Sequence, residues 1–360
     1  MTADRKEFWR GVRVLVTGHT GFKGAWLTLW LHRMGADVAG YALAPPARPN
    51  AFSLARLDEI GRSEFDDVGD RARLRAAFKR HQPQIVFHLA AQALVRAGYA
   101  DPALTYETNA LGTANVLLAA RAQGGVRGVV VVTSDKCYDG RDGARRHRED
   151  DALGGDDPYS ASKACAEHVT AALRATWTGE RHREAMFIAT ARAGNVIGGG
   201  DWSTDRLVPD ALAAFSAGAT LSVRNPSAVR PWQYVLDPVS AYLDLAQKLA
   251  GAGADAFARA WNFGPPEDAE RTVAWVADRL AAAWGPGAAW QAVAGEHLPE
   301  RHALRLDSAA ATAALGWRTR VDLERALELT AHWYRRYAQG ESVRALMLDE
   351  IERYETIRAA

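Results

Sequence analysis

The sequence predicts an α/β protein, with a doubly wound, Rossmann-type parallel sheet followed by a smaller C-terminal substrate-binding lobe. Short, almost continuously apolar segments alternate with amphipathic ones through the first half of the 360-residue chain. Strands of that composition are buried on both faces, as in a parallel sheet covered by helices. A glycine-rich turn joins the first such strand to the first helix. After about Arg192, glycine and proline become frequent and the regular alternation ends.

The expected elements follow one another as right-handed βαβ units. The expected strands are 13–17, 37–43, 84–89, 126–133 and 185–191, with one more before Asp67. The expected helices are 23–34, 101–121 and 157–177. We expect residues 1–191 to bind the cofactor and 192–360 mainly to form the substrate-binding lobe, with segments near 230–264 returning to the first domain. A small-molecule cleft commonly forms between two such parts.

Composition narrows the classes of function. The 44 basic and 43 acidic residues give a net charge of +1, which creates no broad field for nucleic acid or a membrane surface. There is no apolar run long enough to span a membrane, and the charged first ten residues lack the apolar core of a secretory signal. Cys137 and Cys165 are too few for a disulfide framework or a cysteine-rich zinc module. We therefore expect a cytoplasmic protein with no metal site.

The strongest local motif is TGHTGFKG at 17–24, between the first strand and the first helix. At such a junction Gly18 permits the turn, Gly21 lets the backbone approach a pyrophosphate, and Gly24 lets the helix pack closely. The candidate cofactor contacts here are Gly18, Thr20, Gly21, Phe22 and Gly24. The alternative is a glycine turn that binds no ligand. His19, in the same loop, could simply face solvent, and we assign it no catalytic role.

The residues after the next strands leave the cofactor's identity open. No acid follows the second strand to bind a ribose, and Arg48 nearby could pair with a 2′-phosphate, so the choice between NAD and NADP is not decided by the residues. Asp67 and Val68 are candidate adenine contacts, although Asp67 could equally be a surface-loop acid. Leu89 and Ala90, together with Tyr159 and Lys163, complete the candidate cofactor set, and His88 lies either near the ribose or in the core.

Five residues form the candidate reaction centre. Tyr159 and Lys163 have the i, i+4 spacing that puts a phenol and an ammonium on one helix face, where the cation would favour the phenolate. Ser134 follows the strand 126–133 and can hydrogen-bond a substrate hydroxyl. Asp135 and Lys136 come next, and an acid beside a base suits an elimination reaction. The alternatives are a solvated helix face and a surface turn.

These motifs, taken together, resemble those of the extended short-chain dehydrogenase/reductase family and, within it, the NAD-dependent sugar-nucleotide dehydratases. The resemblance runs almost end to end, through TGHTGFKG (17–24), HLAAQ (88–92), TSDKCY (133–138), DPYSASK (157–163), RAGNVIGGGDW (192–202), RPWQYVLDP (230–238) and WNFGP (261–265). Dehydratases acting on dTDP-glucose or GDP-mannose typically have Asp-Glu where this chain has Asp135-Lys136, as the subgroup for CDP-glucose has it.

The resemblance implies a reaction and further site residues. It implies that NAD is the cofactor, that Tyr159 takes the proton of the sugar 4-hydroxyl with Ser134 and Lys163 assisting, and that Asp135 protonates the departing 6-hydroxyl. Lys136 or another base would remove the C5 proton. The implied partner is a nucleoside diphosphate hexose such as CDP-glucose, with candidate contacts at Arg96, Asn195, Arg206 and Arg230. Trp202 and Trp232 could line this pocket or pack in the core.

Three other interpretations stay open. One is a 4,6-dehydratase acting on a different nucleotide sugar, and another is an NAD-dependent nucleotide-sugar 4-epimerase, which would not need Asp135 and Lys136. The third is a dinucleotide-binding sensor without catalysis, which is expected to lack part of the set formed by Ser134, Tyr159 and Lys163. The resemblance also implies a homodimer or higher homo-oligomer, paired through the helices 101–121 and 157–177.

Overall fold

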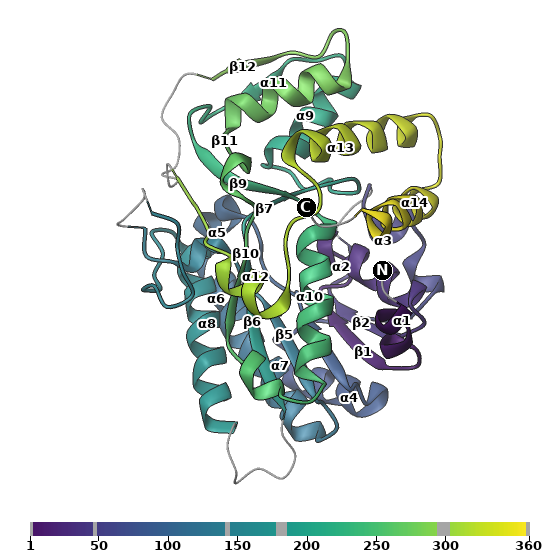
Figure 1. The fold of residues 1–360 in the computed structure, drawn as a ribbon, viewed down its shortest axis with the longest axis vertical. Helices are drawn as coiled ribbons and strands as arrows, with labels where there is room; N and C mark the ends of the chain where they lie inside the picture. The colour runs from purple at the N-terminus through teal and green to yellow at the C-terminus, as the bar shows by residue number, and fades with distance from the viewer. Residues whose placement is uncertain (1–2, 46–48, 141–144, 178–185, 294–302, 358–360) are drawn as a thin grey trace.

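A seven-stranded parallel sheet forms the centre of the computed structural model (Figure 1), which confirms the expected fold class. The structure describes residues 3–45, 49–140, 145–177, 186–293 and 303–357. The strand order is β10-β6-β5-β4-β1-β2-β3. The strands are β1 (Arg13–Thr17), β2 (Asp37–Ala42), β3 (Arg62–Phe65), β4 (Ile85–His88), β5 (Gly128–Val132), β6 (Phe187–Ala193) and β10 (Ala260–Phe263).

Helices cover both faces of this sheet. One layer contains α2 (Phe22–Arg33), α10 (Leu236–Leu249) and, outside α2, α14 (Val343–Thr356). The other layer contains α4 (Arg71–His81), α7 (Gly112–Gln123) and α8 (Pro158–Trp177). Shorter helices are α1 (Ala3–Trp9), α3 (Ala51–Leu54), α5 (Val95–Ala100), α6 (Pro102–Tyr106) and α12 (Ala309–Leu315).

The alternation of strand residues builds two cores, one on each face of the sheet. Val14 and Val16 of β1 belong to the same buried cluster as Trp26 and Trp30 of α2. Leu15, between the two valines, belongs to the cluster on the opposite face. Because both faces are covered, the strands can be apolar at every position, which is the pattern that the sequence shows. The sheet is therefore a rigid platform, and its carboxyl edge can position a site.

The second part of the chain forms a smaller lobe, at the top of Figure 1. It contains the three-stranded sheet β11-β9-β7 and the strand pair β12-β8. Its elements are β7 (Asn195–Ile197), α9 (Leu207–Ser216), β8 (Leu221–Val223), β9 (Val229–Tyr234), β11 (Glu270–Thr272), α11 (Val273–Trp284), β12 (Trp290–Ala292) and α13 (Leu323–Ala338). Between these elements the chain returns to the large sheet, because α10 packs on β5 and β6 and β10 pairs with β6.

One expected helix is wrong in detail. Residues 101–121 do not form a continuous helix but α6, a π-helical turn from Glu107 to Leu111 and then α7. A π turn inserts an extra residue and redirects the side chains within it. Here Asn109 donates to Ser162 Oγ at 2.8 Å and to the Gln92 carbonyl at 3.0 Å, which ties the turn to α8 and to the segment after β4.

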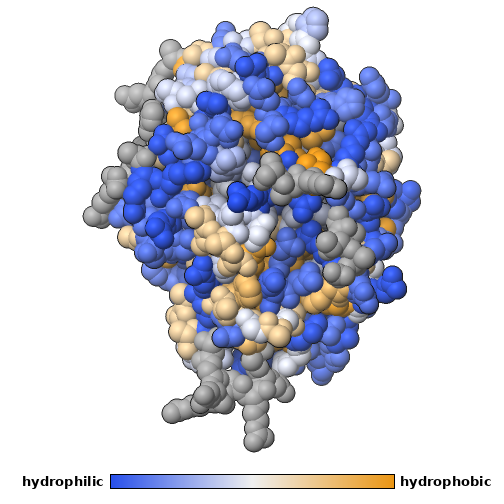
Figure 2. Space-filling view, viewed as in Figure 1, coloured by the Kyte–Doolittle hydropathy of each residue, from blue (hydrophilic) through white to orange (hydrophobic). Residues whose placement is uncertain are grey.

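The surface visible in Figure 2 is mostly hydrophilic, with small separate hydrophobic patches. In the part of the chain that the structure describes, no helix is both long and apolar enough to cross a membrane. Within the same residues, no group of three or more His, Cys, Asp and Glu side chains is arranged to hold a metal ion.

Candidate active site

A cavity of about 680 Å³ lies at the carboxyl edge of the large sheet, beneath the smaller lobe. In an open α/β sheet this edge is where ligands bind. The structure brings most of the candidate site residues named from the sequence to this cavity. They are Gly18, Thr20, Gly21, Phe22, Gly24, Asp67, Val68, Leu89, Ala90, Arg96, Ser134, Asp135, Lys136, Tyr159, Lys163, Asn195, Arg206 and Arg230.

The glycine loop forms a close-fitting backbone cradle at one end of the cavity. Gly18 has a φ of +74°, and a Cβ there would lie 2.6 Å from Ala90 N. A Cβ on Gly24 would lie 2.0 Å from the Gly18 carbonyl oxygen. Both positions therefore require glycine. The loop opens α2 without a side-chain cap, so backbone N–H groups remain available at the helix start. These residues fit the pyrophosphate of a dinucleotide.

Beside this cradle the structure corrects one expectation and refines another. His19 does not face solvent: it is buried against Gly40 and between Phe52 and Phe65. Burial lowers the pKa of His19 to about 4, so the ring is neutral. Asp67 lines the cavity while its carboxylate accepts the Gly69 N–H at 2.7 Å, which fixes the turn after β3. Arg48 lies outside the described residues.

Packing bears on three residues whose place the sequence left open. His88 is a core residue, since its ring bonds Thr17 Oγ1 at 2.7 Å and Thr113 Oγ1 at 3.0 Å. Trp232 is buried and lines the cavity. Trp202 instead packs edge-on against aromatic rings of α13, Trp333 among them.

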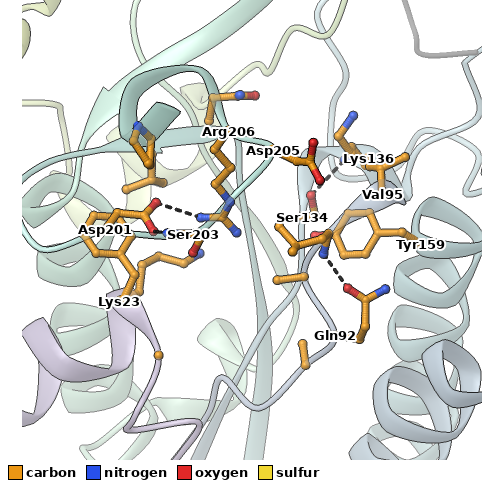
Figure 3. Close-up of a pocket in the computed structure, with 18 of the residues that line it drawn as sticks. Lys23, Gln92, Val95, Ser134, Lys136, Tyr159, Asp201, Ser203, Asp205 and Arg206 are labelled. Carbon is orange, nitrogen blue, oxygen red and sulfur yellow. Dashed lines mark hydrogen bonds and ion pairs between the residues drawn. The ribbon is translucent and has the colours of Figure 1, made fainter. Parts of the chain in front are cut away.

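Ser134, Tyr159 and Lys163 all line the cavity, and Figure 3 shows Ser134 beside Tyr159. Lys163 donates to the Val132 carbonyl at 3.4 Å, and burial lowers its pKa to about 8. Burial also raises the pKa of Tyr159 to about 12, although a hydrogen bond with Ser134 and the positive charge of Arg206 act to lower it. In the protein alone, desolvation outweighs the nearby charges, and the expectation that positive charge beside Tyr159 favours its phenolate stays a prediction.

Asp135 and Lys136 begin the short helical turn that follows Ser134. The Ser134 hydroxyl accepts from the Lys136 N–H at 3.2 Å and donates to Asp135 Oδ1 at 3.0 Å. Asp135 is only 3% exposed, and among the described residues its Oδ2 has no hydrogen-bond partner. Burial raises the pKa of Asp135, although the positive charges of Lys136 and Arg230 act to lower it. A carboxyl group in this environment is suited to donate a proton.

Arginines and aspartates also line the cavity. Asp205, with a φ of +61°, accepts from Arg96 at 2.7 Å and from Arg224 at 3.1 Å. Arg206 pairs with Asp201 at 3.1 Å. Arg96 comes from α5, and the other four come from the lobe. The arginine side chains provide the bidentate donors that phosphate groups prefer.

Sequence reasoning did not include Lys23, Asp201, Asp205 and Arg224 in the site, although all four line the cavity. Figure 3 shows Lys23, Asp201 and Arg206 facing Ser134, Lys136 and Tyr159 across it. Lys23 donates to the Tyr242 hydroxyl at 3.3 Å, and burial, with the charges of Lys163 and Arg206, lowers its pKa to about 7. The position of Lys23 in the glycine loop could have indicated that it lines the site. No spacing in the sequence indicates that Arg96 pairs with Asp205.

A doubly wound sheet, a glycine cradle and a Tyr–Lys pair at the sheet's carboxyl edge define an enzyme with a dinucleotide cofactor. Residues 14–262 match the NAD dependent epimerase/dehydratase family, and the chain belongs to that family. The expected family membership is confirmed, and NAD is the family's cofactor.

Relatives of established name cover nearly the whole chain. It is 44% identical over 351 residues to a CDP-glucose 4,6-dehydratase of Salmonella typhimurium, which covers 97% of this chain and 98% of that protein. A Thermus thermophilus UDP-glucose 4-epimerase solved with NAD superposes with a TM-score of 0.75 at 26% identity, over 90% of this chain and 99% of that one. A Bacillus anthracis dTDP-glucose 4,6-dehydratase shares the fold, with a TM-score of 0.76 at 19% identity over 91% and 98% of the two chains.

Proposed function

We propose that this chain is an NAD-dependent CDP-glucose 4,6-dehydratase, a hydro-lyase that converts CDP-D-glucose to CDP-4-keto-6-deoxy-D-glucose and water. The observation that carries the proposal is the buried Asp135, with one oxygen that has no hydrogen-bond partner among the described residues, in the same cavity as Ser134 and Tyr159. A 4-epimerase needs the hydroxyl groups alone, whereas loss of water also needs an acid. The 44% identity with the Salmonella dehydratase supports the same reaction and the same nucleotide.

The protein's own groups divide the reaction into two parts. In the first, the 4-hydroxyl of the hexose binds Ser134 and Tyr159, and the Tyr159 oxygen takes its proton as C4 becomes a ketone. The Lys163 ammonium, anchored on the Val132 carbonyl, holds positive charge beside the cofactor. When bound on the glycine cradle, NAD supplies a reversible hydride acceptor and, while oxidised, a positive charge that favours the Tyr159 phenolate.

In the second part, the ketone makes the proton on C5 acidic, and a base removes it. Lys136 lies beside Asp135 and is our candidate for this base. The protonated Asp135 carboxyl donates its proton to the 6-hydroxyl, so water leaves from C6. The hydrogen taken from C4 ends on C6 and a proton returns to C5, which leaves no net oxidation or reduction.

The two ends of the substrate bind different parts of the cavity in this proposal. Asn195, Arg206 and Arg230 bind the diphosphate, since two of them carry guanidinium groups at the cavity wall. Arg96 lies on the sugar side, on α5. Residues 192–360 supply most of this substrate-binding lobe, while 1–191 and the segment that includes α10 and β10 hold the cofactor.

The experiment is mass spectrometry of the purified protein incubated with NAD and, separately, with CDP-, dTDP-, GDP- and UDP-hexoses. Loss of one water from CDP-glucose alone supports the proposal. Loss of water from another donor keeps the dehydratase and contradicts the nucleotide. With no change of mass in any sample, the products are tested by chromatography for a 4-epimer, which would overturn the dehydratase.

We further propose that the enzyme works as a cytoplasmic homodimer. Leu104, Tyr106, Leu111 and Leu118, from α6 to α7, expose 37–60% of their surface. Exposed apolar side chains on neighbouring turns favour burial against a second copy. Cys137 and Cys165 are both free thiols, which fits a reducing compartment. Light scattering during gel filtration, with Leu111→Asp as the interface variant, tests the dimer.

A further inference from the structure

A buried ion pair lies directly behind the loop that carries the acid–base residues. Glu167 of α8 and Arg192 of β6 are 2.8 Å apart, and their side chains are only 3% and 4% exposed. Glu167 follows Tyr159 and Lys163 at four-residue intervals, so all three lie on one face of α8. Neither Glu167 nor Arg192 lines the cavity. The pair therefore does not belong to the site described above, although it adjoins it.

Glu167 holds the start of the loop. Thr133, the residue before Ser134, donates its hydroxyl to Glu167 Oε1 at 2.5 Å. The other carboxylate oxygen accepts from Thr190 of β6 at 2.8 Å and from Arg192. One carboxylate thus joins the catalytic helix, the neighbouring strand and the first residue of the loop.

Arg192 holds the end of the same loop. Its guanidinium donates to the Tyr138 hydroxyl at 2.8 Å and to the Glu149 carbonyl at 3.1 Å. The Tyr138 hydroxyl in turn donates to Asn262 Oδ1 at 2.6 Å, on β10. The Tyr138 ring is stacked on His147, with centroids 4.7 Å apart and planes at 4°. Tyr138 is fully buried and does not line the cavity.

We propose that Glu167 and Arg192 are positioning residues, which set Asp135 and Lys136 in register with Tyr159 and Lys163 by fixing both ends of the loop 133–138. A buried ion pair contributes little net stability compared with an apolar pair, so it is retained more readily where it fixes geometry. The hydrogen bonds of this pair reach Thr133 and Tyr138 and no other part of the loop. This inference rests on the proposed dehydratase reaction.

The proposal separates the two parts of that reaction. Oxidation at C4 depends mainly on Tyr159 and Lys163, which belong to α8 itself, with Ser134 of the loop assisting. Elimination depends on Asp135 and Lys136, whose loop packs against α8 and is fixed at its two ends by the Glu167–Arg192 pair. Loosening one loop end should therefore slow elimination more than C4 oxidation. A displacement of about 1 Å can slow a positioned reaction by roughly 100-fold.

The experiment uses Thr133→Val and Tyr138→Phe in the full chain, because removing Glu167 or Arg192 would leave a buried charge and could prevent folding. Thr190→Val is the matched control, since Thr190 is buried and donates to the same carboxylate but does not belong to the loop. Single-turnover reactions with CDP-glucose would follow reduced nicotinamide by absorbance and water loss by mass spectrometry. Hydrogen–deuterium exchange would report the amides of Lys136 and Cys137.

We expect both loop variants to slow water loss on the order of 10- to 100-fold, with C4 oxidation changed less than about threefold, so that reduced nicotinamide accumulates. Their loop amides should exchange faster. Thr190→Val should show neither change, and Thr133→Ser should restore the wild-type rates. Equal loss of both parts of the reaction, or the same behaviour in Thr190→Val, would overturn the positioning role. A wild-type protein that releases no water from any nucleotide sugar would instead overturn the proposed function.

Discussion

The two ends of the cavity are built to recognise ligands in different ways. At the cofactor end the surface is backbone: Gly18 and Gly24 leave no room for a Cβ. At the substrate end the surface consists of charged side chains. Asp205 pairs with Arg96 and Arg224, and Arg206 pairs with Asp201. A backbone cradle is encoded within eight consecutive residues. The charged end is assembled from α5, the segment before α9 and the segment after β8.

This difference decides how each end should respond to substitution. The backbone cradle leaves no room for an added methyl group, so such a substitution should disrupt cofactor binding. The charged end is partly exposed and redundant, so a single change should alter affinity by a modest factor. The reaction centre between them should be the most sensitive of the three, because its groups act on the reacting atoms.

Tyr159→Phe carries the largest expected effect. The substitution removes the group that accepts the proton of the 4-hydroxyl while keeping the buried ring, so we expect both C4 oxidation and water loss to fall by about 10³- to 10⁴-fold. Single-turnover absorbance of reduced nicotinamide checks it. A variant retaining more than about a tenth of the wild-type rate would show that another base acts there.

Asp135→Asn should separate the two parts of the reaction, C4 oxidation and water loss. The amide cannot donate the proton that the leaving 6-hydroxyl needs, so water loss should slow by about 10²- to 10³-fold while C4 oxidation continues. Accumulated reduced nicotinamide, measured with CDP-glucose, is the expected signature. Parallel loss of both parts would place Asp135 in binding instead of proton donation.

The pH dependence should show the same division in the unmodified enzyme. Burial raises the pKa of Asp135, so its protonated form persists to a higher pH than an ordinary aspartate but is lost as pH rises. Tyr159, whose pKa burial raises to about 12, ionises more readily as pH rises. Oxidation at C4 should therefore accelerate with pH, whereas elimination should slow in the pH range where Asp135 loses its proton, although its base gains from the same rise. Stopped-flow measurements from acid to alkaline pH check this opposition, and a common pH profile would contradict it.

Gly24→Ala tests the cradle. Its Cβ would lie 2.0 Å from the Gly18 carbonyl oxygen, and overpacking of this kind costs about 1–3 kcal/mol. We expect NAD affinity to fall by about 10- to 100-fold, measured by calorimetric titration. Gly218→Ala is the control: Gly218 has a positive φ, of +66°, but open space around it. That variant should lose stability without losing NAD affinity.

Asp205→Asn should have the smallest effect. It weakens the pairs with Arg96 and Arg224, which are worth about 1 kcal/mol or less at this exposure. We expect the KM for CDP-glucose to change by no more than about fivefold, with kcat nearly constant. Steady-state kinetics on CDP-glucose check this. A large loss of kcat would mean that the charged end controls the reaction centre. It would contradict the expectation that this end affects only substrate affinity.

The same contrast explains how much could be predicted from the sequence. The fold and the glycine loop were predicted because apolar strands and a glycine turn are local patterns. Tyr159 and Lys163 were predicted because helical spacing fixes their common face. Arg224 and Asp205 were not, since their encounter depends on the three-dimensional path of the lobe. His19 was placed wrongly because its burial depends on Gly40, on another strand.

The edge of the large sheet has a consequence for how the protein is made. β10, which lies beside β6, comes from residues 260–263, after much of the lobe has been traversed. Until that strand is synthesised, β6 is an unpaired edge of buried, mostly apolar residues. Exposed edges of this kind pair readily with other chains. A fragment ending near residue 191 should therefore aggregate during expression, while one that extends beyond Phe263 should not, and nascent chains would need protection over that interval.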